Sequence, residues 1–270
     1  APDRSMPLVL LPPDRIEADP DLLANLDRVV TSIYRLITFS RQHLADDLLD
    51  HFLASTNELQ QLLGIKNAQM EAQTEAEAVT YLANLDRGLE HVVDEIRHHV
   101  DFAAPQQLFE LFRIISPEGH RQHPNSYRHC LVQVGRYLCP ESAALPQAMA
   151  ALFANLPSIA NPVLRAVYFH HELIRIHPFA DGNGRTARIA KNWMLMYRLY
   201  PPIFIRDEDE KIEYITTLER SFLELERSPG RWNRHTADFF DQEIRRILGN
   251  SRYLLTELEV IGEARSSNGS

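Results

Sequence analysis

The sequence predicts a mostly α-helical protein with one small β-hairpin. Along most of the 270 residues, apolar side chains recur at the 3.6-residue spacing of a helix face. One stretch, residues 128–138, instead alternates weakly between apolar and polar side chains and has a glycine near its middle, as a hairpin does. No Gly/Ser-rich linker divides the chain, and no repeat with a period of roughly 20–50 residues is visible. We therefore expect one helical body.

Three helices are expected in the first third of the chain. An amphipathic pattern covers residues 21–37, and a second helix covers residues 44–64, with a glycine at its end. Residues 78–96 have the most regular pattern, which keeps the helical period over about five turns. This last pattern predicts a long helix with one buried face.

The remaining elements follow in the rest of the chain. Pro105 begins a helix that runs to residue 115, because proline is well tolerated in the first helical turn. Prolines, glycines and histidines then interrupt the pattern over residues 116–140, which contain the expected hairpin. Helical patterns resume over residues 145–156, 162–174, 189–200, 212–225 and 237–248.

These elements suggest four segments along the chain. The most plausible seam lies near residues 100–106, between the long helix and the helices that follow it. We expect the N-terminal helices to pack on the core as an extension and not to form an independent domain. The segments are an N-terminal tail (1–20), a helical extension (21–104), a core (105–250) and a C-terminal helix with a tail (251–270).

Composition argues against several classes of function. The net charge of −9 is unlike that of a nucleic-acid-binding surface, which needs basic patches. The uncharged run Ser142–Leu164 contains three prolines, so we do not expect a membrane span there. No secretory signal is visible, and Cys130 and Cys139 are too few for a disulfide framework, so we expect free thiols and a cytoplasmic protein. His170 and His171 are adjacent, but zinc sites need three or four ligands and no third ligand has a convincing spacing.

The run of twelve residues 177–188 concentrates groups that bind a polyphosphate. Gly182 and Gly184 allow backbone to approach an anion closely, and the helix expected just beyond them would present free N–H groups to phosphate. Asn183 adds a side-chain donor. Arg185 and Arg188 are three residues apart on one helical face, and their forked cations suit phosphate oxygens. A pair of surface arginines is the simplest alternative for these two residues.

The same run contains a base and an acid. His177 precedes Pro178, which disfavours the α conformation for the residue before it, so the preceding helix should end at His177 and leave this base facing the loop. A histidine that only caps the helix is the alternative. Asp181 supplies hard oxygen ligands that suit Mg²⁺, or it caps the next helix. Phe179 is expected to anchor the loop to the apolar core.

This run resembles the signature of the Fic family. It matches every fixed position of the motif HPFx(D/E)GNGRxxR. Proteins of that family typically transfer AMP from ATP to a hydroxyl group of a target protein. The resemblance covers roughly residues 125–220 and implies a Fic-type helical bundle, with the motif between two central helices and a β-hairpin flap upstream of it.

The resemblance also implies a role for each site residue. His177 would deprotonate the target hydroxyl, and Asp181 would hold Mg²⁺. The two glycines and the asparagine between them would form the anion cradle. Arg185 and Arg188 would reach the β- and γ-phosphates, with Arg188 on the γ-phosphate. Tyr214, on the next helix, would line the adenine pocket, although a tyrosine at helical spacing is more often part of a core.

We therefore interpret the chain as a protein adenylyltransferase that uses Mg²⁺ and ATP and modifies Ser, Thr or Tyr hydroxyls. The flap around residues 128–140 would hold an extended target segment by strand addition, because an edge strand has unpaired N–H and C=O groups. Two alternatives stay open: a Fic-type transferase of another group or nucleotide, and a regulatory module that binds without turnover. A homodimer also stays open.

Many Fic proteins carry an inhibitory helix with the pattern (S/T)xxxE(G/N), which residues 56–61 match only in part. In this register Gln60 takes the place of the inhibitory glutamate. A neutral amide facing Arg188 cannot form the charge-assisted pair that competes with phosphate, which predicts weak or absent autoinhibition. A second register ends in Glu58 but has Ala54 in place of Ser or Thr, and an ordinary polar helix end is a third alternative.

Overall fold

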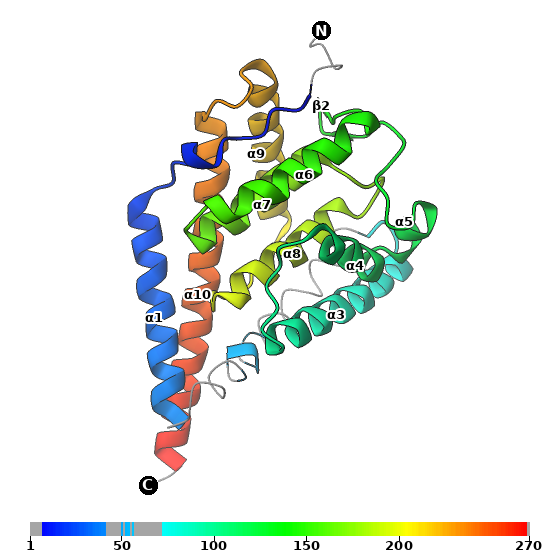
Figure 1. Ribbon diagram of the computed structural model, residues 1–270. Helices are drawn as coiled ribbons and strands as arrows, with labels where there is room; N and C mark the ends of the chain where they lie inside the picture. The colour runs from blue at the N-terminus through cyan, green and yellow to red at the C-terminus, as the bar shows by residue number, and fades with distance from the viewer. Residues whose placement is uncertain (1–6, 42–49, 51, 55, 57–71, 269–270) are drawn as a thin grey trace.

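The computed structural model describes residues 7–41, 50, 52–54, 56 and 72–268, and this part is mostly helical, with one two-stranded hairpin (Figure 1). The predicted fold class is confirmed. The elements are η1 (Pro13–Arg15), α1 (Pro20–Arg41), α3 (Glu75–Arg97), α4 (Pro105–Ile115), α5 (Pro117–Gln122), β1 (Gln133–Val134), β2 (Tyr137–Leu138), η2 (Ser142–Ala144), α6 (Leu145–Asn155), η3 (Leu156–Ser158), α7 (Pro162–Ile176), α8 (Asn183–Tyr197), α9 (Glu208–Arg227) and α10 (Arg234–Asn268).

Helices α7 and α8 form the centre of the fold. Every side chain of α7 from Ala166 to Ile176 is buried, as are most side chains of α8. A helix that is buried on all sides lies inside a protein and not at its surface. In Figure 1 this pair lies in the middle of the helices, where α3 and α4 pack on α8, and α6 and α10 pack on α7. The loop of residues 177–182 therefore connects two core helices, which is the position that the Fic resemblance implies for the motif.

The N-terminal extension packs on the core at two places. Helix α1 lies along α10, where Leu26 and Ile33 are fully buried (Figure 1). Helix α3 packs on α4 and α8, and the Asn84 amide donates to the Ile115 carbonyl at 3.3 Å. Helix α10 is continuous from 234 to 268, so the boundary that we placed at residue 250 falls inside a helix.

Residues 8–16, which we assigned to an N-terminal tail, pack against α7. Leu10 and Leu11 are buried. The Leu11 N–H donates to Glu172 Oε2 at 3.0 Å, and its carbonyl accepts from the Tyr168 hydroxyl at 2.6 Å. These bonds satisfy backbone groups that burial removes from water. Leu10 and Leu11 are therefore part of the core.

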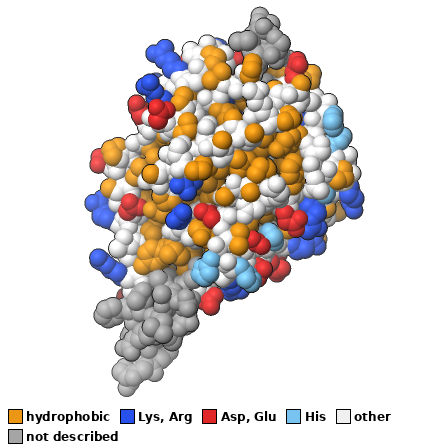
Figure 2. All heavy atoms as spheres, in the orientation of Figure 1, with side chains coloured by type: hydrophobic (Ala, Val, Ile, Leu, Met, Phe, Trp, Pro, Cys, Tyr) orange, Lys and Arg blue, Asp and Glu red, His pale blue; other side chains and the backbone are white. Residues whose placement is uncertain are grey.

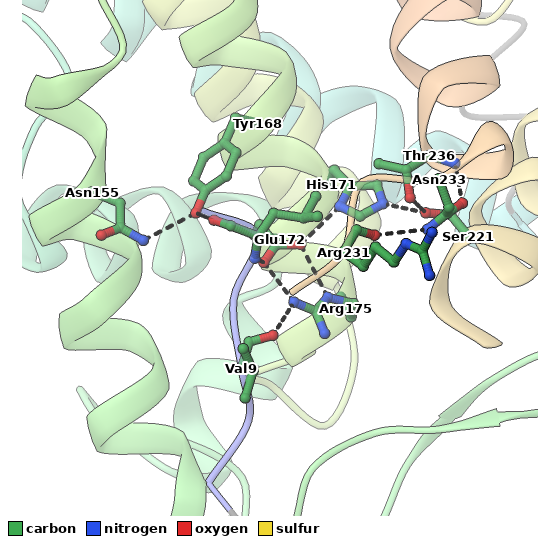
Figure 3. A network of polar contacts seen from close by, with 11 residues as sticks. Val9, Asn155, Tyr168, His171, Glu172, Arg175, Ser221, Arg231, Asn233 and Thr236 are labelled. Carbon is green, nitrogen blue, oxygen red and sulfur yellow. Dashed lines mark hydrogen bonds and ion pairs between the residues drawn. The ribbon is translucent and has the colours of Figure 1, made fainter. Parts of the chain in front are cut away.

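A buried polar network fixes α7 to its neighbours (Figure 3). On α7, Glu172 accepts from Arg175 Nε at 3.0 Å and Nη2 at 2.7 Å, and it contacts His171 at 2.8 Å. His171 Nε2 lies 2.8 Å from the Ser221 hydroxyl on α9, which lies 2.6 Å from the Thr236 hydroxyl on α10. Burial alone would raise the pKa of Glu172, but the charge of Arg175 holds it at about 2. The network is thus ionic and fully internal.

The hairpin confirms the prediction for residues 128–138, with shorter strands. Strands β1 and β2 pair antiparallel, with Gln133 opposite Leu138. Gly135 has φ +56°, a left-handed conformation that glycine adopts readily in two-residue turns. The turn is tied to α9, because the backbone N–H and Nε of Arg136 both donate to Glu219 Oε1, at 3.1 and 2.7 Å.

Some elements differ from the prediction or fall outside it. Helix α5 was not expected, because it begins at Pro117 in a segment whose sequence pattern is irregular. The helix predicted for residues 44–64 lies mostly outside the described residues. None of the described helices combines the length and the apolar character needed to cross a bilayer. On the face displayed in Figure 2, hydrophobic side chains gather in the middle and charged side chains are more frequent toward the edges.

Candidate active site

All eight predicted site residues line one pocket of about 360 Å³. The pocket lies between the loop 177–182, the start of α8, the flap and α9, and Tyr81 of α3 contributes to its wall. The predicted site residues that meet there are His177, Asp181, Gly182, Asn183, Gly184, Arg185, Arg188 and Tyr214. The pocket therefore brings together the base, the carboxylate, the anion-binding backbone and both arginines, whose individual roles stay predictions.

His177 is held as a neutral base. It ends α7 with φ 53° and ψ 63°, and its N–H donates to the Leu173 carbonyl at 2.8 Å. Its Nδ1 lies 3.0 Å from the Ile174 carbonyl, which can only accept, so Nδ1 carries the proton and Nε2 the lone pair. Burial lowers the pKa of His177, although this hydrogen bond opposes the shift. The imidazole is therefore neutral and basic at Nε2 near pH 7.

The loop after His177 is fixed by side chains inside the motif itself. The Asn183 side chain accepts from the Phe179 N–H at 2.9 Å and donates to the Phe179 carbonyl at 2.7 Å. The Phe179 ring stacks on Phe112 with centroids 3.8 Å apart, so it packs in the core as expected of an anchor. The Asn183 amide thus holds the loop, and its backbone N–H at the start of α8 is the group that would meet an anion.

Gly182 is the N-cap of α8, so the alternative that Asp181 caps this helix is wrong. Gly182 has φ +81°, a conformation that would be strained for any residue other than glycine. A Cβ at this position would also lie 2.7 Å from the Ser116 side chain. Gly184 follows in the first turn, where a Cβ would approach Arg188 Nη1 to 3.1 Å. Backbone N–H groups at this helix start have no intrahelical acceptor, so they form a site for anions.

The two arginines have different environments. Arg185 Nη2 lies 3.3 Å from Asp181 Oδ2, and its guanidinium lies over the Tyr81 ring, 4.0 Å from the centroid. Burial lowers the pKa of Arg188, while a hydrogen bond from its side chain to Tyr214 opposes the shift. The Tyr214 hydroxyl also lies 2.7 Å from His170 Nε2. Arg188 is thus held deeper in the pocket than Arg185 and is oriented by α9.

A model of the Fic/DOC family matches residues 19–195, which is more than half of the chain. The chain belongs to the Fic/DOC family. The match begins at residue 19, directly before α1, so the family model includes the whole N-terminal extension as well as the motif.

Curated relatives in the family carry the name protein adenylyltransferase Fic. The protein from Nematostella vectensis is 32% identical over 134 residues, which is 48% of this chain and 31% of that protein. The protein from Culex quinquefasciatus is 30% identical over 131 residues, or 47% of this chain and 26% of that protein. This chain therefore spans between a quarter and a third of the length of these relatives.

Solved Fic structures share the fold at low sequence identity. A Fic domain containing signaling protein from Bacteroides thetaiotaomicron matches with TM-score 0.68 and 18% identity, over 87% of this chain and 97% of that one. Fic-1 from C. elegans matches with TM-score 0.57 and 19% identity, over 92% and 75%. At these identities the likeness concerns the fold alone.

Arg128 connects the flap of this Fic domain to the motif, and sequence reasoning missed it. Its guanidinium is buried and donates to the carbonyls of His177 at 2.6 Å and Ile176 at 3.3 Å. It also donates to the carbonyls of Cys130 at 2.7 Å and Pro140 at 2.6 Å, on both sides of the hairpin. No periodicity marks this residue, because its partners come from separate parts of the chain.

Asp181 is suited to bind a magnesium ion only together with other oxygen ligands. Its side chain is 76% exposed at the pocket, and it is the one carboxylate among the described residues that line this pocket. Mg²⁺ is commonly held by one or two carboxylates with phosphates and waters, so the donor set fits an ion that arrives with a nucleotide. His170 and His171 contact Tyr214, Ser221 and Glu172 instead, and the described residues contain no cluster of three metal-ligating side chains.

The degenerate inhibitory segment lies almost entirely outside the described residues. Residues 57–61, with Glu58 and Gln60, are not described, so both registers stay predictions. Thr56, at the start of the first register, is buried, and its hydroxyl donates to the Leu53 carbonyl at 2.9 Å.

Proposed function

We propose that this chain is a protein adenylyltransferase that transfers AMP from ATP to a Ser, Thr or Tyr hydroxyl of a target protein. The observation that carries the proposal is the neutral imidazole of His177, whose Nδ1 is bound to a backbone carbonyl. This imidazole lines the same pocket as the glycines at the start of α8 and both arginines. The names of the curated relatives support the same activity.

In the proposed reaction, His177 Nε2 takes the proton of the target hydroxyl. The hydroxyl oxygen forms a bond to the α-phosphorus of ATP, and the bond from that phosphorus to the oxygen of the β-phosphate breaks, so pyrophosphate leaves. The N–H groups at the start of α8, together with Arg185 and Arg188, would hold the phosphates in position and stabilise their negative charge. Tyr214 would border the adenine.

Asp181 would hold Mg²⁺ together with phosphate oxygens, and the ion would supply charge neutralisation when bound. Because Asp181 pairs with Arg185 in this structure, the carboxylate and the guanidinium would separate when a nucleotide enters. The proposal includes a cytoplasmic location, since Cys130 and Cys139 are both free thiols and a reducing compartment keeps them so.

The flap would hold the target segment. Val134 of β1 lines the pocket, and Leu131 just before it is 61% exposed, so an extended peptide beside the flap would reach both. Strand addition would pair its backbone with the flap edge. A Fic structure at TM-score 0.51 and 15% identity, IbpAFic2 covalently tethered to Cdc42, supports a protein as the kind of target.

The test uses ATP labelled at either the α- or the γ-phosphate. We expect the purified chain with Mg²⁺ to label itself or lysate proteins from α-labelled ATP and not from γ-labelled ATP. His177→Ala should lose this labelling, while its thermal unfolding stays close to that of wild type. Label from the γ position would indicate phosphorylation, and preferred transfer from another nucleotide would indicate a different group. ATP binding without any labelling would indicate a binding module.

A further inference from the structure

Tyr81 lines the candidate active-site pocket although it belongs to the N-terminal extension. It is placed by α3, whose first residue is Glu75, and its ring is partly buried. The guanidinium carbon of Arg185 lies over this ring, 4.0 Å from its centroid. Both side chains line the same pocket as His177 and Asp181.

Asp181 and Tyr81 are two partners of Arg185 that differ in kind. Asp181 Oδ2 lies 3.3 Å from Arg185 Nη2, in an ion pair whose carboxylate is 76% exposed. In addition, the guanidinium carbon lies over the Tyr81 ring. Ion pairs at exposed carboxylates are weak, whereas cation–π contacts persist without using the N–H groups. The ring is therefore the partner that can stay when the carboxylate turns to another cation.

We propose that Tyr81 is a positioning residue that orients Arg185 toward the β- and γ-phosphates and so favours ATP over AMP in this pocket. The inference rests on the proposed function for the direction in which the nucleotide binds. The geometry gives the reason: the guanidinium carbon of Arg185 lies over the Tyr81 ring, whereas an anion is bound by the N–H groups of a guanidinium. Tyr81 would thus hold the guanidinium at the pocket wall and leave N–H groups for phosphate.

The position of Tyr81 also connects the extension to catalysis. Helix α3 packs on α4 and on α8, which carries Arg185, so the ring and the guanidinium are held by elements in mutual contact. Ordering a flexible arginine before the nucleotide arrives reduces the conformational entropy that binding would otherwise remove.

The test compares the binding of two nucleotides by calorimetry in the presence of Mg²⁺. The probes are AMP and α,β-methylene-ATP, whose bridging carbon prevents transfer. Tyr81→Leu should weaken binding of the triphosphate about 2- to 30-fold, the range of a cation–π contact, and leave AMP binding within about twofold. Tyr81→Phe should bind both like wild type, because the ring is kept and only the hydroxyl is lost. Tyr81→Met replaces the leucine variant if the latter does not fold, and unchanged AMP binding verifies an intact pocket.

Two controls make the result specific. Tyr197→Leu removes a tyrosine near a different arginine, Arg198, at the opposite end of α8 from the motif, and should change neither affinity. In an Arg185→Ala background, Tyr81→Leu should have no further effect on triphosphate binding.

Several outcomes would overturn the inference. Equal weakening of AMP and triphosphate would mean that Tyr81 contacts the nucleoside or supports the pocket generally. An additive effect in the Arg185→Ala background, or no effect of Tyr81→Leu in the wild-type background, would exclude action through Arg185. Failure of wild type to bind the triphosphate would contradict the preference for ATP. If binding depends on Tyr81 as expected but no AMP is transferred to protein, the proposed function fails and the positioning role stands.

Discussion

At the scale of single residues, the candidate base is placed by a conformation that residues other than glycine seldom adopt. His177 has φ 53°, and its N–H and Nδ1 contact two successive carbonyls at the end of α7. The following proline prevents another helical turn. The result is an imidazole whose tautomer is set by the fold, which a base needs before any substrate arrives.

The pH dependence of AMP transfer should report this environment. Burial lowers the pKa of His177 below its ordinary 6.5, so the imidazole stays neutral as the pH falls through that value. The acid limb of the transfer rate, measured at saturating ATP from pH 5 to 8, should therefore lie below pH 6.5. His177→Ala should reduce the rate by about 10²–10⁴ and remove the limb. A limb centred above 6.5 would contradict this prediction.

Asp181→Ala should weaken the dependence of transfer on Mg²⁺. The change removes the carboxylate that lines the pocket, so saturation should require a higher Mg²⁺ concentration. It also frees Arg185 from its ion pair, so binding of AMP without Mg²⁺ serves as the control for the pocket. A Mg²⁺ titration that superimposes on that of wild type would leave Asp181 without a role in metal binding.

Arg128→Ala should destabilise the fold by about 3 kcal/mol or more, because it removes the donor to four carbonyls that lie beside the motif and the flap. Urea unfolding measures the change. Arg121→Ala is the matched control, since this arginine is 66% exposed and pairs with Glu118 on the same short helix. A loss below 1 kcal/mol would mean that water replaces the guanidinium at these carbonyls.

At the scale of elements, the flap is a two-stranded hairpin that other parts of the molecule must hold. Two strands of two residues each are marginal in isolation. Arg128 fixes the base of the hairpin, and Glu219 of α9 fixes its turn through two bonds from Arg136. The orientation of the flap over the pocket therefore depends on α7 and α9 more than on its own strands.

Glu219→Ala should raise the KM for a protein target roughly 2- to 10-fold without changing ATP affinity, because the flap turn loses its carboxylate partner. Steady-state transfer with each substrate varied in turn separates the two effects. Glu224→Ala is the control on the same helix, because this residue pairs with Arg227 at 3.7 Å and not with the flap. Equal changes in both constants would indicate a general disturbance of α9.

At the scale of the whole molecule, two buried carboxylates are each paired with buried cations. Glu172 pairs with Arg175 within α7, and Glu243 on α10 accepts from Lys191 of α8 at 2.8 Å and from Arg246 at 2.9 Å. Burial opposes ionisation of both, but the neighbouring cations hold each pKa at about 2. Protonation of either carboxylate would leave buried cations without partners.

Stability should therefore decline in acid in two stages. Burial lowers the pKa values of His170 and His171, so the unfolded chain binds protons that the folded chain does not, and stability falls below pH 6.5. The stability from Glu172 and Glu243 is fully present above pH 4.5 and is lost as the pH falls toward 2. Urea unfolding at pH 7, 5.5 and 3.5 measures both stages.

Glu172→Gln tests the second stage. It should cost about 3–5 kcal/mol at pH 7, because Arg175 is left buried without its counterion, and should flatten the decline below pH 4.5. Glu118→Gln, whose carboxylate is 82% exposed, should leave both the stability and its pH profile unchanged. A decline equally steep in the Glu172→Gln variant would assign the acid transition to other groups.

The sequence by itself determined the features that depend on local spacing. Helix periodicity located most helices, Gly135 marked the turn, and Pro178 marked the end of α7, because each acts on its immediate neighbours. The run 177–188 likewise placed seven of the eight site residues, since one loop and the first two turns of α8 carry them, whereas Tyr214 lies on α9.

Only the tertiary structure decided which distant residues complete this site. Arg128 contacts the end of α7, Tyr81 covers Arg185, and Glu219 holds the flap, each across more than forty residues of chain. Leu10 and Leu11, in a segment that looks like a tail in sequence, are buried in the core, where Glu172 and Tyr168 satisfy the backbone of Leu11. Periodicity cannot reveal such contacts, because burial and pairing across the chain follow from how the helices pack.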